Sequence, residues 1–252
     1  MTTTAFRRLA FAAALAPLAL GLAACNKDAT DAAAPSGAPI AKIAPPAGKA
    51  WSDVVTVTPE GGYMMGNPQA PIKLVEYGSL TCPHCAEFAE KSSAEIRDNF
   101  VASGRVSFEF RNFIRDAIDL TATQLTHCGS PESFFALTDQ VFANQKSFFD
   151  AAEKAGKPAQ DAAFQQEPAK RGPAIGQLTG LTDFFAARGI AKDQANMCLA
   201  DAAKAEAMAA NVTKQSDQYQ ITGTPTFLLN GKKLDTNLWE DVKPMLEKAG
   251  AR

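Results

Sequence analysis

The sequence predicts the α/β fold class, with a helical domain inserted into an α/β domain. Three observations support this prediction. Residues 51–114 have the pattern of two strands, a helix and a third strand, and residues 211–252 return to strand, turn, strand and helix. Residues 115–210 carry apolar side chains at spacings of three and four, which is the period of an amphipathic helix.

The first α/β segment contains short apolar runs. Those rich in β-branched residues predict strands near 54–58, 72–77 and 106–114. Gly66-Asn67-Pro68 separates the first two strands, because glycine and proline interrupt regular structure. A helix is expected over residues 86–101 from the spacing of its apolar side chains, Phe88, Ile96, Phe100 and Val101.

Local signals also mark the inserted and C-terminal segments. Ser130-Pro131-Glu132 is typical of a helix start, with a cap followed by proline in the first turn. Large apolar residues with helical spacing predict a bundle core rather than a ligand site: Leu120, Leu125, Phe134, Phe135, Leu137, Val141, Phe142, Phe148 and Phe149. In the C-terminal segment, Asn230-Gly231 is typical of a hairpin turn after a strand at 226–229, and a last helix is expected over 236–249.

Residues 1–24 have the pattern of an export signal. Two arginines precede an apolar stretch that is short for a membrane span and is interrupted by Pro17. The stretch ends in Leu22-Ala23-Ala24-Cys25, which resembles the lipobox of bacterial lipoproteins, so we expect a lipoprotein signal peptide with lipid on Cys25. The alternative is an ordinary secretory signal. In both cases the mature protein is expected in the periplasm, where disulfides persist, and the membrane that holds the lipid, inner or outer, stays open.

Residues 25–50 are rich in alanine, proline and small polar residues. Such a segment has too few large apolar side chains to form a core. We therefore expect a flexible tether here, followed by the folded part of the chain.

Cys82-Pro83-His84-Cys85 lies between an apolar run that predicts a buried strand and the helix that follows. Thr81 is available as the N-cap of this helix, and Pro83 in its first turn costs little because an N–H would be unpaired there. A thiolate at Cys82 would face the unpaired N–H groups at the positive end of the helix, which lowers the pKa of a cysteine and makes its thiolate a stable leaving group. This setting predicts a redox-active disulfide.

Other roles for this cysteine motif are less favoured. Half of a zinc site is one, but zinc sites usually need four Cys or His ligands, and the chain has only two histidines, His84 and His127, and no second such motif. A structural disulfide is another, but a two-residue loop constrains the unfolded chain very little. A periplasmic copper- or zinc-binding protein that uses Cys82, Cys85 and His84 stays as an alternative of another class.

The chain has five cysteines, an odd number for an exported protein. If Cys25 carries lipid and Cys82 pairs with Cys85, then Cys128 and Cys198 remain to pair with each other in a structural disulfide. The chain-entropy model values such a long loop at about 4 kcal/mol. The alternatives are a second catalytic pair or two free thiols, although neither residue lies in an exchange motif.

Composition excludes several other functions. The chain carries 25 Lys and Arg against 27 Asp and Glu, without the basic cluster that nucleic-acid binding requires. It has no glycine-rich loop of the phosphate-binding kind. No bound cofactor is expected, because the cysteines themselves carry the electrons.

Two groups of residues carry a family resemblance. The segment from Glu76 to Cys85, Glu-Tyr-Gly-Ser-Leu-Thr-Cys-Pro-His-Cys, and the segment Gly223-Thr224-Pro225-Thr226-Phe227 resemble the DsbA family of bacterial periplasmic thiol–disulfide oxidoreductases. The resemblance extends over the chain beyond the tether. It implies a thioredoxin fold with an inserted α-helical domain, in which residues 51–114 and 211–252 form the thioredoxin-fold domain and residues 115–210 form the insertion. Cys128 and Cys198 resemble the extra helical-domain disulfide that some members carry.

The resemblance also implies roles at the cysteine motif. Cys82 would be the exposed sulfur that substrates attack, Cys85 its buried partner, and His84 a donor to the Cys82 thiolate. Pro83 and His84, as the pair between the cysteines, favour an oxidant. Glu76 would be a buried acid that exchanges a proton with Cys85. The alternative for Glu76 is a carboxylate that is salt-bridged or exposed at the sheet edge.

The second segment is expected to face the cysteines. Pro225 would be a cis-proline, and the backbone of Thr224 would pair with an extended substrate segment by strand addition. Thr224 also resembles the corresponding residue of disulfide isomerases.

The function implied is a monomeric dithiol oxidase that introduces disulfides into reduced, unfolded exported proteins. A quinone-linked membrane partner similar to DsbB would reoxidise it. A disulfide isomerase or reductase on the same fold is the alternative within this class.

Overall fold

The computed structural model describes residues 37–252, which belong to one compact unit. The predicted signal peptide, the predicted lipidation residue Cys25 and the first part of the predicted tether lie outside the described residues. Within the described part, the α/β fold with a helical insertion is confirmed.

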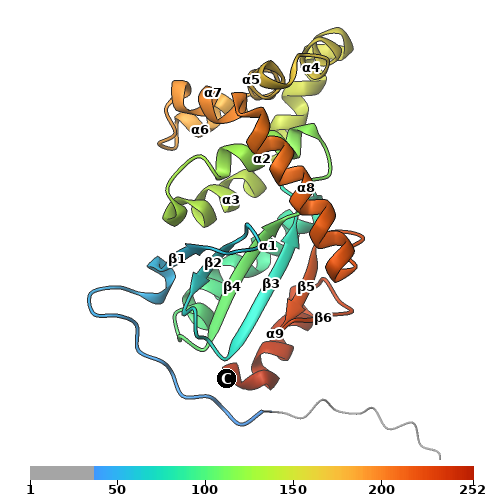
Figure 1. Cartoon of the computed structure of the whole chain (residues 1–252). Helices are drawn as coiled ribbons and strands as arrows, with labels where there is room; N and C mark the ends of the chain where they lie inside the picture. Colours follow the sequence, from blue (N-terminus) through green and yellow to red (C-terminus); the bar gives the residue numbers. More distant parts are fainter. Residues whose placement is uncertain (1–36) are drawn as a thin grey trace, which may run out of the picture. The chain divides into compact units, whose positions relative to one another are not determined.

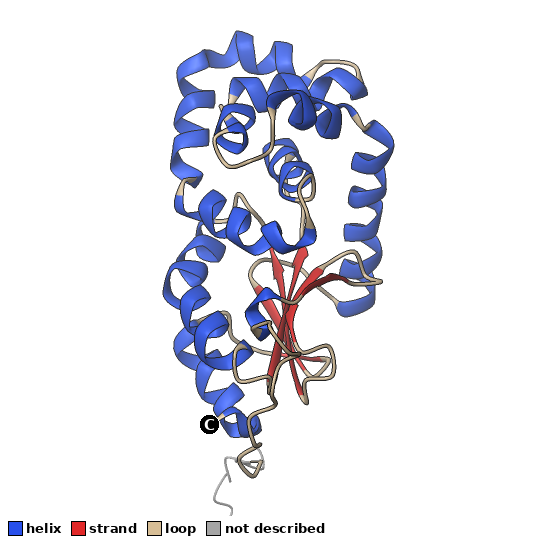
Figure 2. Cartoon of the chain, turned by 90° about the vertical axis from the view of Figure 1, so that its left-hand side faces the viewer, coloured by secondary structure: helices blue, strands red, loops and turns tan. Residues whose placement is uncertain are grey.

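A six-stranded sheet, red in Figure 2, forms the centre of the α/β part. Its strands follow the order β1-β2-β4-β3-β5-β6 (Figure 1). Its strands are β1 (Val55–Val57), β2 (Tyr63–Gly66), β3 (Ile72–Gly78), β4 (Val106–Asn112), β5 (Thr226–Leu229) and β6 (Lys232–Lys233). β3 and β4 pair in parallel, and the other neighbours are antiparallel. β3 is almost continuously buried because both faces of the sheet are covered around it.

β2 is a strand that the sequence analysis did not predict. It pairs with β1 in a hairpin and with β4 along its other edge, where Tyr63 lies opposite Phe110. Its sequence, Tyr-Met-Met-Gly, has no β-branched residue and ends at Gly66, which the sequence analysis interprets as part of a break. The pairing with β4, and not local propensity, therefore makes this segment a strand.

Two helical segments of the α/β part position the cysteines and close the core. The first is α1 (Pro83–Glu95), which continues into the π-helical segment η2 (Ile96–Val101), so the helix expected over 86–101 is confirmed with an earlier start. The second is α9 (Trp239–Leu246), followed by η4 (Glu247–Ala251). The ring of Phe88 on α1 lies 4.4 Å from that of Phe227 on β5 and 5.9 Å from that of Trp239 on α9. This aromatic cluster holds α1 against the sheet.

The insertion follows β4 and returns to β5. It contains α2 (Ala117–Thr126), η3 (Pro131–Ser133), α3 (Phe134–Ala143), α4 (Gln145–Phe164), α5 (Pro168–Leu178), α6 (Leu181–Ala186), α7 (Lys192–Ala200) and α8 (Ala202–Tyr219). In Figure 1, α8 runs from the other helices of the insertion back to the sheet. The helical region ends at Tyr219 rather than near residue 210, because no glycine or proline interrupts α8 before Gln220 adopts a left-handed conformation at φ 54°.

Cys128 and Cys198 form a disulfide within the insertion, so the predicted pairing is confirmed. The bond joins the segment after α2 to α7, and the two Cα atoms are 6.0 Å apart. The side-chain amide of Gln194 on α7 donates to the Cys128 carbonyl at 3.0 Å and supports the same contact. The bond therefore connects two helices that are far apart in the sequence.

α8 is attached to the sheet by a buried polar cluster. The Tyr77 hydroxyl on β3 donates to Gln215 Oε1 on α8 at 2.9 Å, and Arg111 Nη1 on β4 donates to the same hydroxyl at 2.9 Å. Arg111 also forms a bidentate ion pair with Glu109, at 2.7 and 3.0 Å. These bonds fix the helix that returns from the insertion.

Residues 37–43 pack against the α/β part, so the expected tether over 25–50 is wrong for these residues, whereas residues 44–50 are exposed. The N–H of Gly37 donates to the Lys248 carbonyl at 2.7 Å, and that of Ile40 donates to the Gly250 carbonyl at 2.9 Å. The indole of Trp51 donates to the Ile43 carbonyl at 2.8 Å. Composition predicts a tether because it reports only side chains, whereas backbone groups make most of these bonds.

Candidate functional site

The cysteine motif lies where the central strand β3 meets α1. The turn of residues 79–81 connects them, Cys82 is the N-cap of α1 in an extended conformation, and Pro83 is its first helical residue. The sequence analysis expects Thr81 to be this cap. Instead, the Thr81 hydroxyl donates to Asp116 Oδ2 at 2.8 Å, because α2 begins beside the turn.

Cys82 is only 3 % exposed, so the expectation that it is the exposed sulfur of the pair is wrong in this structure, because the Thr224 segment covers it. Its Sγ atom is 3.3 Å from the carbonyl oxygen of Thr224. A hydrogen bond from the Cys85 thiol lowers the pKa of Cys82 to about 4, against burial, and the backbone N–H groups of Cys85 and His84 contribute in the same direction. The start of α1 therefore stabilises the Cys82 thiolate, as expected from the sequence.

Cys85 is fully buried, and both cysteines are free thiols in this structure. Burial raises the pKa of the Cys85 thiol well above its usual range, and its bond to Cys82 and the charge of Glu76 raise it further. The Ser79 N–H, which donates to Cys85 Sγ at 3.5 Å, acts in the opposite direction. The site therefore favours the thiolate at Cys82 and the neutral thiol at Cys85.

Glu76 lies on the central strand beneath the cysteines and is 3 % exposed. It pairs in register with Phe110 on one side and Phe227 on the other, so it is neither at a sheet edge nor in a salt bridge. Burial raises the pKa of Glu76 well above its usual value, and the charges of Asp139 and Cys82 add to the increase. Its Oε1 atom has no hydrogen-bond partner. A neutral carboxyl in this position can give a proton to a neighbouring sulfur.

His84 lies in the cysteine motif, but its ring does not bond Cys82. The side chain is 74 % exposed, and Nδ1 is 3.9 Å from Glu87 Oε2, one turn along α1. The contribution of His84 to the thiolate comes from its backbone N–H. The expectation that this residue donates to Cys82 is therefore correct for the backbone and not for the imidazole.

The segment 223–227 faces the cysteines, as the sequence analysis expects. The peptide bond between Thr224 and Pro225 is cis, and the Thr224 carbonyl is the group beside Cys82. β5 begins directly after it, so the position of this segment is set by the pairing of β5 with β3. The structure therefore brings Glu76, the cysteine motif and Thr224-Pro225 together, and leaves the Cys128–Cys198 disulfide in the insertion.

Besides Asp116, two more side chains of the insertion contact the turn, and sequence reasoning missed all three. Gln145, at the start of α4, donates through Nε2 to the carbonyls of Leu80 at 2.8 Å and Cys82 at 3.0 Å. Asp119, on α2, accepts hydrogen bonds from Ser79 and Leu80. Asp116 and Asp119 are three residues apart, which is the spacing of a helix N-cap and its partner. The sequence therefore suggests only a local capping contact and gives no sign that the Asp119 side chain also binds the turn. No sequence signal singles out Gln145.

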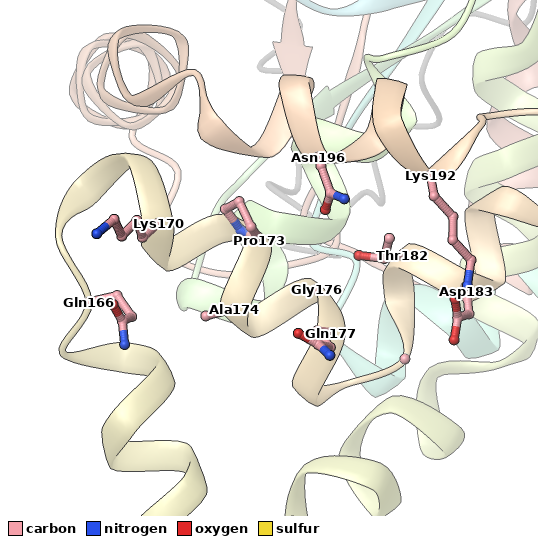
Figure 3. Close-up of a pocket in the computed structure, with 11 residues that line it drawn as sticks. Gln166, Lys170, Pro173, Ala174, Gly176, Gln177, Thr182, Asp183, Lys192 and Asn196 are labelled. Carbon is pink, nitrogen blue, oxygen red and sulfur yellow. Dashed lines mark ion pairs between the residues drawn. The ribbon is translucent and has the colours of Figure 1, made fainter.

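Away from the cysteines, a hollow of about 550 Å³ lies in the insertion between α5, α6 and α7 (Figure 3). Its wall is polar, with Lys170, Asn196 and an ion pair between Lys192 and Asp183. The Thr182 hydroxyl has no hydrogen-bond partner, but its oxygen is buried in the wall. None of the expected site residues lines this hollow.

Residues 37–252 hold neither a cluster of metal ligands nor a membrane-spanning helix. Within this range, no three His, Cys, Asp or Glu side chains are grouped as metal ligands. No helix in the same range is long and apolar enough to cross a bilayer. The described residues therefore give no support to the metal-binding alternative.

The fold and the site together define a class of protein. A cysteine pair at the start of the helix after the central strand, opposite a cis-proline and with helices inserted after β4, is the DsbA type of thioredoxin fold. The chain belongs to the thioredoxin family: the family model described as Thioredoxin matches residues 58–248.

Solved structures and a curated relative agree with this class. The protein-disulfide isomerase from Novosphingobium aromaticivorans is 33 % identical, with a TM-score of 0.70 over 74 % of this chain and 96 % of that chain. Wolbachia pipientis α-DsbA1 is 22 % identical, with a TM-score of 0.60 over 74 % of this chain and 89 % of that chain, and shares the fold. A Rickettsia bellii protein, provisionally named a protein-disulfide oxidoreductase, is 25 % identical over 190 residues. The match covers 75 % of this chain and 65 % of that relative, which is less than two thirds of its length.

Proposed function

We propose that this protein is a thiol–disulfide oxidoreductase that acts as a dithiol oxidase on exported proteins through Cys82 and Cys85. The observation that carries the proposal is the asymmetry of the pair: the site lowers the pKa of Cys82 to about 4 and raises the pKa of Cys85. A disulfide whose reduced form is stabilised in this way is a strong oxidant. The names of the Novosphingobium and Rickettsia relatives support thiol–disulfide chemistry.

The reaction has two exchange steps. A substrate thiolate attacks Cys82 Sγ in the oxidised enzyme, so that a substrate–Cys82 bond forms, the Cys82–Cys85 bond breaks and Cys85 takes up a proton. A second substrate thiolate then attacks the substrate sulfur, and Cys82 leaves as its stable thiolate. The substrate loses two electrons to the enzyme; one of its two protons is matched by the proton on Cys85, and the other goes to solvent.

Glu76 is the proposed source of the proton for Cys85. Its charge is one of the causes that raise the pKa of Cys85, so the two groups interact, and burial keeps Glu76 protonated above the usual range of a carboxyl. Its unpartnered Oε1 is free to take part in proton transfer. If Glu76 were ionised while Cys85 left as a thiolate, two buried negative charges would lie side by side; a neutral Glu76 that gives its proton to Cys85 leaves only one.

Thr224 and Pro225 are proposed to bind the substrate. The Thr224 carbonyl already lies 3.3 Å from Cys82 Sγ, and Gly223 leaves open space beside it. An extended substrate segment can pair with the backbone here and place its own cysteine next to Cys82.

A disulfide isomerase is the second candidate, because the Novosphingobium relative carries that name. Both activities pass through a mixed disulfide between the substrate and Cys82. In an oxidase a substrate thiolate attacks Cys82 of the enzyme disulfide, and in an isomerase the Cys82 thiolate attacks a substrate disulfide. They differ in whether the enzyme works as the disulfide or as the dithiol, and the low pKa of Cys82 favours the oxidase.

The cellular setting follows from the sequence. We propose a periplasmic protein, acting as a monomer, that is anchored to a membrane through lipid on Cys25. A DsbB-like, quinone-linked membrane protein is the proposed reoxidant. Lipid analysis of the mature chain tests the anchor.

The reduction potential of the Cys82–Cys85 pair tests the proposed direction of electron flow. The chain from Asn26 onward is equilibrated in glutathione buffers, and alkylation with peptide mapping keeps Cys128 and Cys198 separate. A potential well above the glutathione poise supports the oxidase. A potential near that of thioredoxin means that the protein donates electrons, and contradicts it.

A further inference from the structure

Asp119 of the insertion binds the turn that carries the cysteines. Its Oδ2 atom accepts the Ser79 hydroxyl at 2.6 Å and the Arg115 N–H at 3.0 Å. Its Oδ1 atom accepts the Leu80 N–H at 2.9 Å. Two of these three donors belong to the turn between β3 and α1, so this side chain joins α2 to the exchange site.

The carboxyl of Asp119 is fully buried, and no cation pairs with it among residues 37–252. Burial raises the pKa of Asp119 to about 7, while the bonds from Ser79, Arg115 and Leu80 act in the opposite direction. A buried carboxylate without a cation is costly unless its hydrogen bonds are complete. Its contacts therefore have a strict geometry: the turn must present its donors at these positions.

Ser79 transmits this geometry to both cysteines. Its N–H donates to Cys85 Sγ at 3.5 Å, and its carbonyl accepts the Cys82 N–H at 3.1 Å. Gln145 completes the arrangement from α4, because it binds the carbonyls of Leu80 and Cys82. Asp119 therefore accepts a backbone N–H of the turn, and Gln145 donates to its backbone carbonyls, so both kinds of peptide group are held in place.

We propose that Asp119 is a positioning residue for thiol–disulfide exchange, which orients Ser79 and, through it, both cysteines. This inference rests on the proposed function for its biological meaning. In the isolated protein, Asp119 affects the equilibrium constant between the dithiol and the disulfide of Cys82 and Cys85, which can be measured without any substrate protein.

The substitution Asp119→Asn tests the proposal in the full chain. An amide has one acceptor and one donor end, so in either orientation its NH₂ group meets a backbone N–H, that of Leu80 or that of Arg115. The turn must move to relieve this clash. We expect the equilibrium constant for reduction by glutathione to fall by about tenfold, since a hydrogen bond to a charged group is lost, and the pKa of Cys82 to rise.

Two further variants make the test decisive. Ser79→Ala removes one of the three bonds to Asp119, together with the bond from the Thr81 N–H to Ser79 Oγ at 3.3 Å, and leaves the backbone contacts of Ser79 with both cysteines. We expect a shift in the same direction of about threefold, because two of the three bonds to Asp119 remain. Thr121→Val is the matched control, because Thr121 is a buried residue of α2 whose hydroxyl bonds only the Ala117 carbonyl of its own helix. It should leave the equilibrium constant unchanged.

The outcomes separate the two proposals. If Asp119→Asn and Ser79→Ala both keep the wild-type constant and the wild-type pKa of Cys82, the positioning role is overturned. A shift with Thr121→Val as large as that with Asp119→Asn overturns it as well, because the effect would then report the stability of α2. If Asp119→Asn does not fold, Ser79→Ala decides. A failure of the proposed oxidase is seen elsewhere, in the wild-type potential itself.

Discussion

The chain has two cysteine pairs, and their surroundings are opposite in kind. Cys82 and Cys85 have only two residues between them: Cys82 is the N-cap of α1 and Cys85 lies in its first turn. Backbone N–H groups are directed at Cys82, and a buried acid, Glu76, lies behind Cys85. Cys128 and Cys198 are separated by 70 residues and join two helices of the insertion. A carbonyl oxygen lies beside a sulfur in each pair, that of Thr224 at 3.3 Å from Cys82 Sγ and that of Gln194 at 3.6 Å from Cys128 Sγ, so the contrast lies in the helix start and the buried acid.

The difference shows that loop length and local charge decide what a disulfide does. A short loop removes little entropy from the unfolded chain, so opening it costs little, and the helix end stabilises the thiolate that is released. A long loop removes much more entropy, and nothing beside it favours the open form. The first pair is suited to exchange and the second to stability.

The largest expected effect comes from removing the attacked sulfur. Cys82→Ser should abolish oxidation of a reduced protein substrate, because no other sulfur lies beside Thr224. The measurement is the rate of disulfide formation in a reduced model protein. Activity that survives this substitution and is lost in Cys128→Ser would assign the exchange reaction to the other pair.

Removing the second pair should affect stability alone. In the double variant Cys128→Ser with Cys198→Ser, the free energy of unfolding should fall by about 4 kcal/mol, the chain-entropy value for such a loop. Denaturant unfolding of the oxidised protein gives the value. The glutathione equilibrium constant of Cys82–Cys85 should stay at its wild-type value; a large change in it would show that the two pairs are coupled.

Stability should depend on pH differently in the reduced and oxidised proteins. The folded reduced protein holds Cys82 at a pKa of about 4, whereas an unfolded cysteine titrates near 8.5. Between these two pH values the unfolded state binds one more proton, so the stability of the reduced protein rises with pH relative to that of the oxidised protein, and this gain is lost as the pH falls through about 4.

Unfolding of both forms in denaturant at several pH values between 5 and 8 measures this difference. The oxidised protein is the control, because it has no Cys82 thiol to titrate while it keeps the other buried acids. A gap between the two forms that stays constant over this range would mean that the pKa of Cys82 is not lowered.

The smallest effect is expected at His84. His84→Ser should raise the pKa of Cys82 by about one unit or less, because an exposed charge is screened by solvent and the backbone N–H stays in place. Thiolate absorbance during a pH titration reports this value. A rise as large as that expected from losing the backbone bonds would show that the imidazole turns toward Cys82 in solution.

The sequence by itself determined the local chemistry of the site. The order of apolar strand, Cys82-Pro83-His84-Cys85 and helix places a cysteine at a helix start, since strand, turn and helix are set by neighbouring residues. The Thr224-Pro225 segment and the pairing of Cys128 with Cys198 were also predicted, the first by resemblance and the second by cysteine count. These are features that short spacings or chemical types reveal.

Only the tertiary structure decided which groups surround the sulfur atoms. Asp119 reaches Ser79 across 40 residues and Gln145 reaches Leu80 across 65, and neither contact has a local pattern. β2 became a strand through its partner β4, and residues 37–40 are held by backbone bonds to the C-terminal segment. The exposure of the His84 ring and the isolation of the Glu76 carboxyl likewise depend on packing. Local spacing fixes the direction of a helix end, whereas burial and long-range hydrogen bonds exist only once distant segments are packed together.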